Sequence, residues 1–217
     1  MALCHGYPGD NKNMDLAEEL ALNGIVVLIF YYRGAWGSEG EYSFTALAPS
    51  TGDALKLLRG LPYVDASRVG LVSHSMGALP LTKIMSHDRS VKTGVLMAPV
   101  SDLKAWTTGP ALDAMLPYFL KIAEGKLMGW NEERLRGDFK KAAVELNPVD
   151  SVRDVTAPLL VVVGSEDTLT VPKSCRLLYE AANKPKKWAI IKDADHNFTE
   201  HRGPLIKTVI EWLNAHL

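Results

Sequence analysis

The sequence has few cysteines, no long apolar run and almost no excess of either charge. Two cysteines among 217 residues exclude a disulfide-rich scaffold. A formal net charge of -1 provides no overall field that would draw the chain to nucleic acid or an anionic membrane. The longest apolar run, residues 25–32, is far shorter than the ~18 residues that cross a bilayer. The net charge and the short apolar runs lead us to expect neither nucleic-acid nor integral-membrane contacts. The first residues lack the basic and apolar segments of a signal peptide, so we expect a cytoplasmic protein.

The two cysteines, Cys4 and Cys175, fall in a predicted strand and a predicted helix far apart in the chain. We expect two buried free thiols in a reducing compartment. A disulfide between them is the alternative.

Motifs for metal and nucleotide chemistry are also missing. The sequence contains no H-E-x-x-H, no paired C-x-x-C, no aspartate-rich metal set and no G-x-x-x-x-G-K-[ST] loop. We therefore expect neither a metal nor another cofactor.

Short β-rich runs alternate with helical patterns along most of the chain, and no internal repeat interrupts them. The pattern predicts strands at Ala2–Cys4, Ile25–Tyr31, Val69–Val72, Val95–Ala98, Leu159–Val163 and Trp188–Ile191. It predicts helices between them at Asp15–Asn23, Gly52–Arg59, Met76–Ser86 and Pro172–Ala182, and after them at Pro204–Leu213. This alternation is typical of a single α/β domain over residues 1–217, with a mostly parallel sheet and helices on both faces.

Residues 101–150 break the alternation because they contain helical pieces but no good strand. The pieces are Ala111–Ile122, Asn131–Arg136 and Phe139–Leu146. We interpret this segment, called the cap segment below, as a small helical insertion over the end of the sheet. A plain run of surface helices is the alternative.

The strongest chemical signal surrounds Ser75, where an apolar strand runs through small residues directly into a helix. Ser73 and Gly77 leave room for a sharp turn that exposes the serine, although the usual G-x-S-x-G pattern has glycine where Ser73 stands. Unpaired N–H groups at the start of the following helix make the Met76 N–H a natural oxyanion donor. Glycine-rich residues 5–9 follow the first strand, and there the Tyr7 N–H is the second candidate, since Pro8 has none.

A histidine base and an acid are expected to follow other strands at the same edge of the sheet. Among six histidines, His196 lies in a polar loop after the last strand. Asp167 follows the strand at 159–163 and qualifies as the acid that orients His196. Glu166 qualifies on chemistry as well, whereas Asp193 and Asp195 would need their own loop to fold back.

The order Ser75, Asp167, His196 and the segments around them resemble the α/β-hydrolase superfamily over nearly the whole chain. Residues 5–9, residues 32–40 and the Ser75 turn look like feruloyl/cinnamoyl-type serine esterases and like catalytic domains of prolyl-oligopeptidase-like peptidases. The resemblance implies a triad of Ser75, Asp167 and His196 with Tyr7 and Met76 as oxyanion donors.

This family usually has two further strands before the one that ends at His5; we expect them to be absent here, with loss of an upstream segment from the sequence as the alternative. The strand at 25–31 would then form an apolar sheet edge, which is prone to pair with another chain. The hypothesis that follows is a homodimer through this edge.

The resulting prediction is a carboxylesterase that hydrolyses short-chain or aromatic acyl esters of small molecules. Apolar residues of the cap segment are candidates to line its acyl pocket, or to form the core of the cap itself; among them are Trp106, Met115, Tyr118, Phe119 and Trp130. A peptidase or amidase, a lipase or monoacylglycerol lipase, and a non-catalytic binding module are the alternatives.

Overall fold

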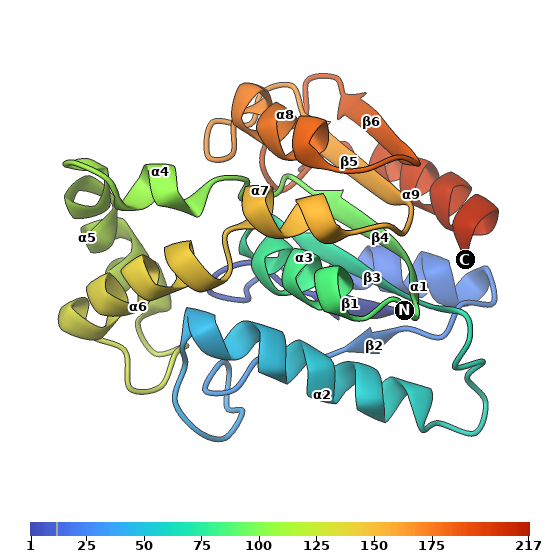
Figure 1. Cartoon of the computed structure of the whole chain (residues 1–217), viewed down its shortest axis with the longest axis horizontal. Coiled ribbons are helices and arrows are strands. Elements are labelled where there is room, and N and C mark those ends of the chain that lie inside the picture. The colour runs from blue at the N-terminus through green and yellow to red at the C-terminus, as the bar shows by residue number, and fades with distance from the viewer. Residues whose placement is uncertain (12) are drawn as a thin grey trace.

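A parallel six-stranded sheet forms the centre of the computed structural model, which describes residues 1–11 and 13–217 (Figure 1). The strand order is β2-β1-β3-β4-β5-β6, and each pairing is parallel. The strands are β1 (Ala2–Cys4), β2 (Leu28–Ile29), β3 (Val69–His74), β4 (Val91–Met97), β5 (Leu159–Gly164) and β6 (Lys186–Ile191). The predicted fold class is thereby confirmed.

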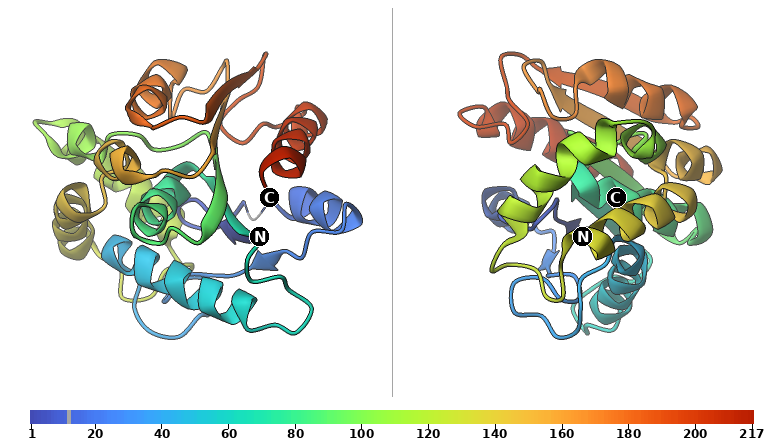
Figure 2. Two further views of the ribbon diagram at one scale, coloured as in Figure 1. Left: turned by 45° about the vertical axis from the view of Figure 1, so that its right-hand side comes forward. Right: turned by 90° about the vertical axis from the view of Figure 1, so that its left-hand side faces the viewer.

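Helices cover both faces of this sheet. The α-helices of the described residues are α1 (Met14–Leu22), α2 (Leu47–Arg59), α3 (Ala78–His87), α4 (Leu103–Thr107), α5 (Ala111–Ala123), α6 (Glu132–Glu145), α7 (Pro148–Ser151), α8 (Pro172–Ala181) and α9 (Arg202–His216). Figure 2 shows α1 and α9 on one side of the sheet and α2, α3 and α8 on the other.

The buried strand β5 shows why both faces are covered. Leu159, Val161 and Val163 join the core beneath α2, α3 and α8, whereas Leu160 and Val162 join the core beneath α1 and α9. Because successive side chains of a strand point to opposite faces, its apolar run supplies both cores.

Strand β2 is much shorter than the predicted strand at 25–31. Only Leu28 and Ile29 pair with β1, opposite Ala2 and Leu3. As an edge strand, β2 has β1 as its one neighbour in the sheet, and the three residues of β1 limit the ladder. The flanking side chains still alternate between the two cores, but all of residues 25–31 remain partly exposed.

The cap segment holds α4, α5, α6 and most of α7, and its first three helices lie beyond one end of the sheet (Figure 1). Helix α6 is continuous where two pieces were predicted, and Asp138 lies within it, between those pieces. The Asp138 carboxylate accepts hydrogen bonds from the Ser43 hydroxyl at 2.8 Å and from the Phe44 N–H. Cap segment and main body are therefore joined by a polar contact as well as by apolar packing.

No helix within the described residues is both long and apolar enough to cross a membrane.

Candidate active site

The three residues predicted to act together all follow carboxyl ends of strands. Ser75 comes directly after β3, Asp167 three residues after β5, and His196 in the loop after β6. Carboxyl ends of parallel strands lie at one edge of the sheet, where ligands of open α/β sheets bind. Ser75 and His196 line the same cavity, and His196 contacts Asp167.

Ser75 occupies a strained backbone position. Its φ of 53° lies in the left-handed region, which a residue with a side chain rarely adopts. Gly77 makes the turn feasible, since a Cβ at that position would lie 2.2 Å from the carbonyl oxygen of Cys4. Gly6 approaches from the neighbouring strand end, and a Cβ there would lie 3.0 Å from the Cβ of Ser75. The backbone is therefore shaped to present one serine side chain to the cavity.

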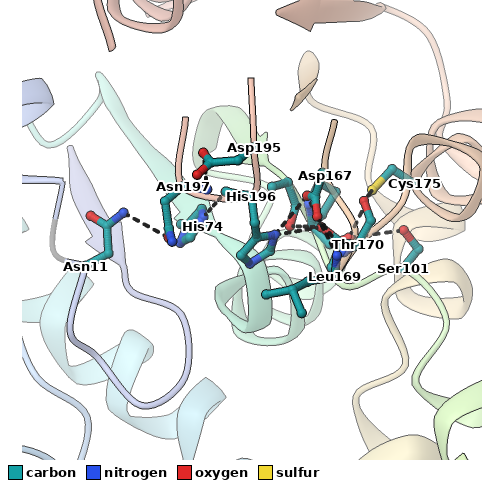
Figure 3. Close-up of polar contacts among 12 residues, drawn as sticks. Asn11, His74, Ser101, Asp167, Leu169, Thr170, Cys175, Asp195, His196 and Asn197 are labelled. Carbon is teal, nitrogen blue, oxygen red and sulfur yellow. Dashed lines mark hydrogen bonds and ion pairs between the residues drawn. The ribbon is translucent and has the colours of Figure 1, made fainter. Parts of the chain in front are cut away.

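His196 is held by a buried carboxylate. Its Nδ1 lies 2.8 Å from Oδ2 of Asp167, whose side chain has no exposed surface (Figure 3). An ionised carboxylate only accepts, so Nδ1 carries the hydrogen and the other ring nitrogen, Nε2, is left as the acceptor. This is the tautomer that a general base needs.

Thr170 completes the environment of Asp167, and the sequence analysis did not identify it. Its hydroxyl lies 2.7 Å from Asp167 Oδ2, 3.1 Å from His196 Nδ1 and 2.9 Å from the carbonyl oxygen of Ala98. The backbone N–H groups of Leu169 and Thr170 both donate to Asp167 Oδ1 at 2.8 Å. Both carboxylate oxygens are thus fixed by donors.

Opposing influences act on the Asp167 carboxyl. Burial alone would raise the pKa of Asp167, but the hydrogen bond and charge of His196, followed by the contacts from Thr170, hold the pKa below its ordinary value. The carboxylate therefore remains ionised at neutral pH, although it is enclosed.

His74, next to Ser75 in the sequence, also contacts the loop that carries His196. Its Nε2 donates to the carbonyl oxygen of His196 at 2.9 Å, and the two rings lie 4.9 Å apart (Figure 3). Burial, with a smaller contribution from His196, lowers the pKa of His74 to about 3. A neutral imidazole thus ties the strand before Ser75 to the loop that carries His196.

A cavity of about 700 Å³ opens beside these residues. The candidate oxyanion donors Tyr7 and Met76 line it together with Ser75 and His196. Its apolar wall comes mainly from the cap segment, in the form of Trp106, Met115, Tyr118, Phe119 and Ile122. Trp130, which the sequence places among the pocket candidates, is not part of this lining; its indole points to Tyr7 and donates to the phenol hydroxyl.

Several residues from the sequence analysis lie outside the cavity. Glu166, the alternative acid, contacts the Ser165 hydroxyl, and Asp195 accepts hydrogen bonds from the backbone of its own loop. Cys4 and Cys175 are buried free thiols. Burial raises the pKa of both thiols to about 12, so neither is a reactive nucleophile at neutral pH.

Sequence comparison relates residues 18–217 to a model of the prolyl oligopeptidase family. An uncharacterized protein of Mycobacterium tuberculosis is 27% identical over 200 residues, which cover 91% of this chain and 63% of that protein. The chain thus spans less than two thirds of this relative. An uncharacterized 31.7 kDa protein of Escherichia coli, from the traX-finO intergenic region, is 24% identical over 259 residues, covering 99% of this chain and 90% of that protein.

Solved structures show the same fold. Est1E of Butyrivibrio proteoclasticus with bound ferulic acid superposes with a TM-score of 0.72 at 18% identity, covering 99% of this chain and 87% of that chain. A monoacylglycerol lipase of Paleococcus ferrophilus gives 0.70 at 20% identity, covering 100% and 94%. An esterase of Pyrococcus furiosus gives 0.71 at 22% identity, covering 99% and 82%. At such identities the likeness shows the fold alone, and it confirms the α/β-hydrolase fold.

Proposed function

The chain belongs to the prolyl oligopeptidase family of α/β-hydrolases, and from that premise we propose that it is a serine carboxylesterase. One observation carries the proposal. A serine in the left-handed backbone region lines an apolar cavity together with a histidine, and the Nδ1 of that histidine is hydrogen-bonded to a buried, ionised aspartate. Backbone strain at a partly exposed serine and a histidine of fixed tautomer are features expected of nucleophilic catalysis.

In the proposed reaction, Ser75 Oγ attacks the ester carbonyl while His196 Nε2 accepts the serine proton. The carbonyl oxygen becomes an oxyanion that the N–H groups of Tyr7 and Met76 stabilise, each contributing on the order of 3 kcal/mol. His196 then protonates the departing alcohol and leaves an acyl group on Ser75. Water, deprotonated by His196, releases the acid and restores the serine. Asp167 remains ionised and stabilises the imidazolium.

The chemistry of the cavity favours an uncharged acyl group as the part of the substrate that it binds. Its wall is mostly aromatic and aliphatic, and its volume falls within the range of small-molecule sites. Within the described lining, Asp10 is the one Asp, Glu, Lys or Arg side chain, and it is paired with Lys126 at 2.8 Å. Short-chain and aromatic acids fit this chemistry, and the ferulic acid bound to Est1E is an acid of the second kind.

Two other substrates remain as candidates. The family name favours a peptide or amide, for which the same nucleophile and base would serve. Exposed apolar side chains at the cavity, Tyr118 at 50% and Leu169 at 54%, favour a lipid ester presented at an interface.

The experiment that tests the proposal compares p-nitrophenyl acetate, butyrate, octanoate and laurate with methyl ferulate and a peptide p-nitroanilide. Ser75→Ala is measured in parallel. We expect ester turnover that Ser75→Ala abolishes, with the best chain length reporting the depth of the pocket. Turnover of the anilide alone would identify an amidase, and ester turnover that survives in Ser75→Ala would overturn the proposal.

A further inference from the structure

Tyr7 belongs to the glycine-rich turn of residues 5–9, where its N–H is a candidate oxyanion donor. Its side chain reaches from this turn to the cap segment. Its hydroxyl donates to the carbonyl oxygen of Phe119 at 2.8 Å and accepts the Nε1–H of Trp130 at 2.6 Å. These partners lie 112 and 123 residues further along the chain. The Tyr7 ring also packs on Phe119, with ring centroids 4.8 Å apart. The Tyr7 side chain is therefore fixed by one donated hydrogen bond, one accepted hydrogen bond and the packing of its ring on Phe119.

The outer side of the same turn is tied to the cap segment as well. Asp10 pairs with Lys126 at 2.8 Å. Trp36 links the two segments. Its indole donates to the carbonyl oxygen of Pro8 at 3.1 Å, and its backbone N–H donates to the carbonyl oxygen of Lys126 at 2.8 Å. Residues 7–10 are thus connected to the cap segment from both sides.

Resting on the proposed function, we propose that Tyr7 is a positioning residue whose phenol, clamped by Phe119 and Trp130, sets the place of its own N–H in the oxyanion hole. A tyrosine side chain has only two rotatable bonds before its ring is fixed, so an anchored hydroxyl restricts the backbone that carries it. Oxyanion stabilisation requires a donor at the place where charge develops, and small misplacements are costly. The cap segment then supports catalysis in addition to forming the apolar wall.

The clamp is present over the pH range in which the enzyme would work. Burial raises the pKa of Tyr7, and the hydrogen bond from Trp130 offsets this only in part. The phenol therefore keeps the hydrogen that it donates to Phe119 at neutral pH.

The test is Tyr7→Phe, which keeps the packed ring and removes only the hydroxyl. We expect kcat for p-nitrophenyl butyrate to fall about tenfold, less than the ~10²–10³ that follows loss of a whole oxyanion donor, with KM within about twofold. Affinity for butylboronic acid, whose adduct with the serine resembles the tetrahedral intermediate, should weaken by a similar factor.

Trp130→Phe removes the other half of the clamp and leaves the phenol bonded to Phe119. It should show the same signature. The double variant should lose little more activity than Tyr7→Phe alone, because the Trp130–Tyr7 hydrogen bond is already absent once the phenol hydroxyl is removed. Tyr63→Phe, at a tyrosine that is 69% exposed, is the matched control and should behave as wild type. Titration of reactive sites with a fluorophosphonate corrects each rate for folded enzyme, and Trp130→Phe carries the test if Tyr7→Phe does not fold.

The outcomes separate this inference from the function on which it rests. Wild-type turnover that depends on Ser75, together with unchanged kcat and boronate affinity in Tyr7→Phe, would overturn the clamp alone. A change confined to KM, or losses in the two single variants that simply add, would also overturn it. Absence of Ser75-dependent turnover in the wild type would overturn the proposed function and the inference together.

Discussion

Replacing His74 by glutamine should remove a defined part of the pH dependence of folding stability. His74 is 3% exposed, and burial together with His196 lowers its pKa to about 3. In the unfolded chain the pKa of a histidine is about 6.5. Between these values the unfolded chain binds a proton at this position and the folded chain does not. The contribution of neutral His74 is therefore fully present above about pH 6.5 and is lost progressively as the pH falls toward about 3.

The size of the effect follows from the pKa difference. Each pH unit within this window is worth about 1.4 kcal/mol, so the wild type should lose about 2 kcal/mol of unfolding free energy through His74 alone between about pH 7.5 and about pH 5. A glutamine does not titrate, and its amide can still donate to the His196 carbonyl. The His74→Gln protein should therefore lack this part of the pH slope.

Urea unfolding at both pH values, followed by tryptophan fluorescence, measures the difference between the two proteins. Because only residue 74 differs, other histidines contribute equally to both and cancel. A pH slope that is the same in wild type and His74→Gln would refute the view that this imidazole is held neutral by burial.

Three further predictions concern the Asp167 carboxylate, the nucleophile turn and the sheet edge. Thr170→Val keeps the shape of the side chain but removes the hydroxyl at Asp167 Oδ2. The activation free energy should rise by about 1.5–3 kcal/mol, so steady-state assays should show kcat lowered roughly tenfold to hundredfold. An unchanged kcat would contradict the role of that hydroxyl. Gly6→Ala places a methyl group 3.0 Å from the Cβ of Ser75 and should slow labelling of Ser75 by a fluorophosphonate. Gly137→Ala, where nothing lies within 4 Å of the new methyl group, is the control and should label like wild type. Equal labelling rates in the two variants would argue against crowding at the nucleophile. The partly exposed apolar edge at residues 25–31 predicts a homodimer that dissociates on dilution in sedimentation velocity, and a monomer at all concentrations would exclude it.

The sequence was sufficient to predict the fold and the placement of the candidate catalytic residues because both follow from local rules. Apolar strands without alternation, such as 159–163, require cover on both faces and hence helices on both sides. Residues that follow parallel strands must gather at one edge, which is why Ser75 and His196 share a cavity.

The features that the sequence missed depend on contacts between distant segments. The strand at 25–31 has the composition of a full strand, but its ladder is limited by the short partner β1. Trp130 is as apolar as the other pocket candidates, yet its indole N–H donates to the phenol of Tyr7 and its side chain is not part of the cavity lining. Thr170 offers one signal in hindsight, since a threonine three residues after an aspartate can donate both its N–H and its hydroxyl to that carboxylate.

The central claim is that Ser75 is a nucleophile activated by His196, and site-resolved labelling tests it most directly. The protein is treated with a fluorophosphonate, digested, and the adduct is located by mass spectrometry in wild type, Ser75→Ala and His196→Ala. We predict an adduct on Ser75 in the wild type, none in Ser75→Ala and strongly slowed labelling in His196→Ala. An adduct on another residue, or labelling of Ser75 that proceeds at the wild-type rate without His196, would contradict the account.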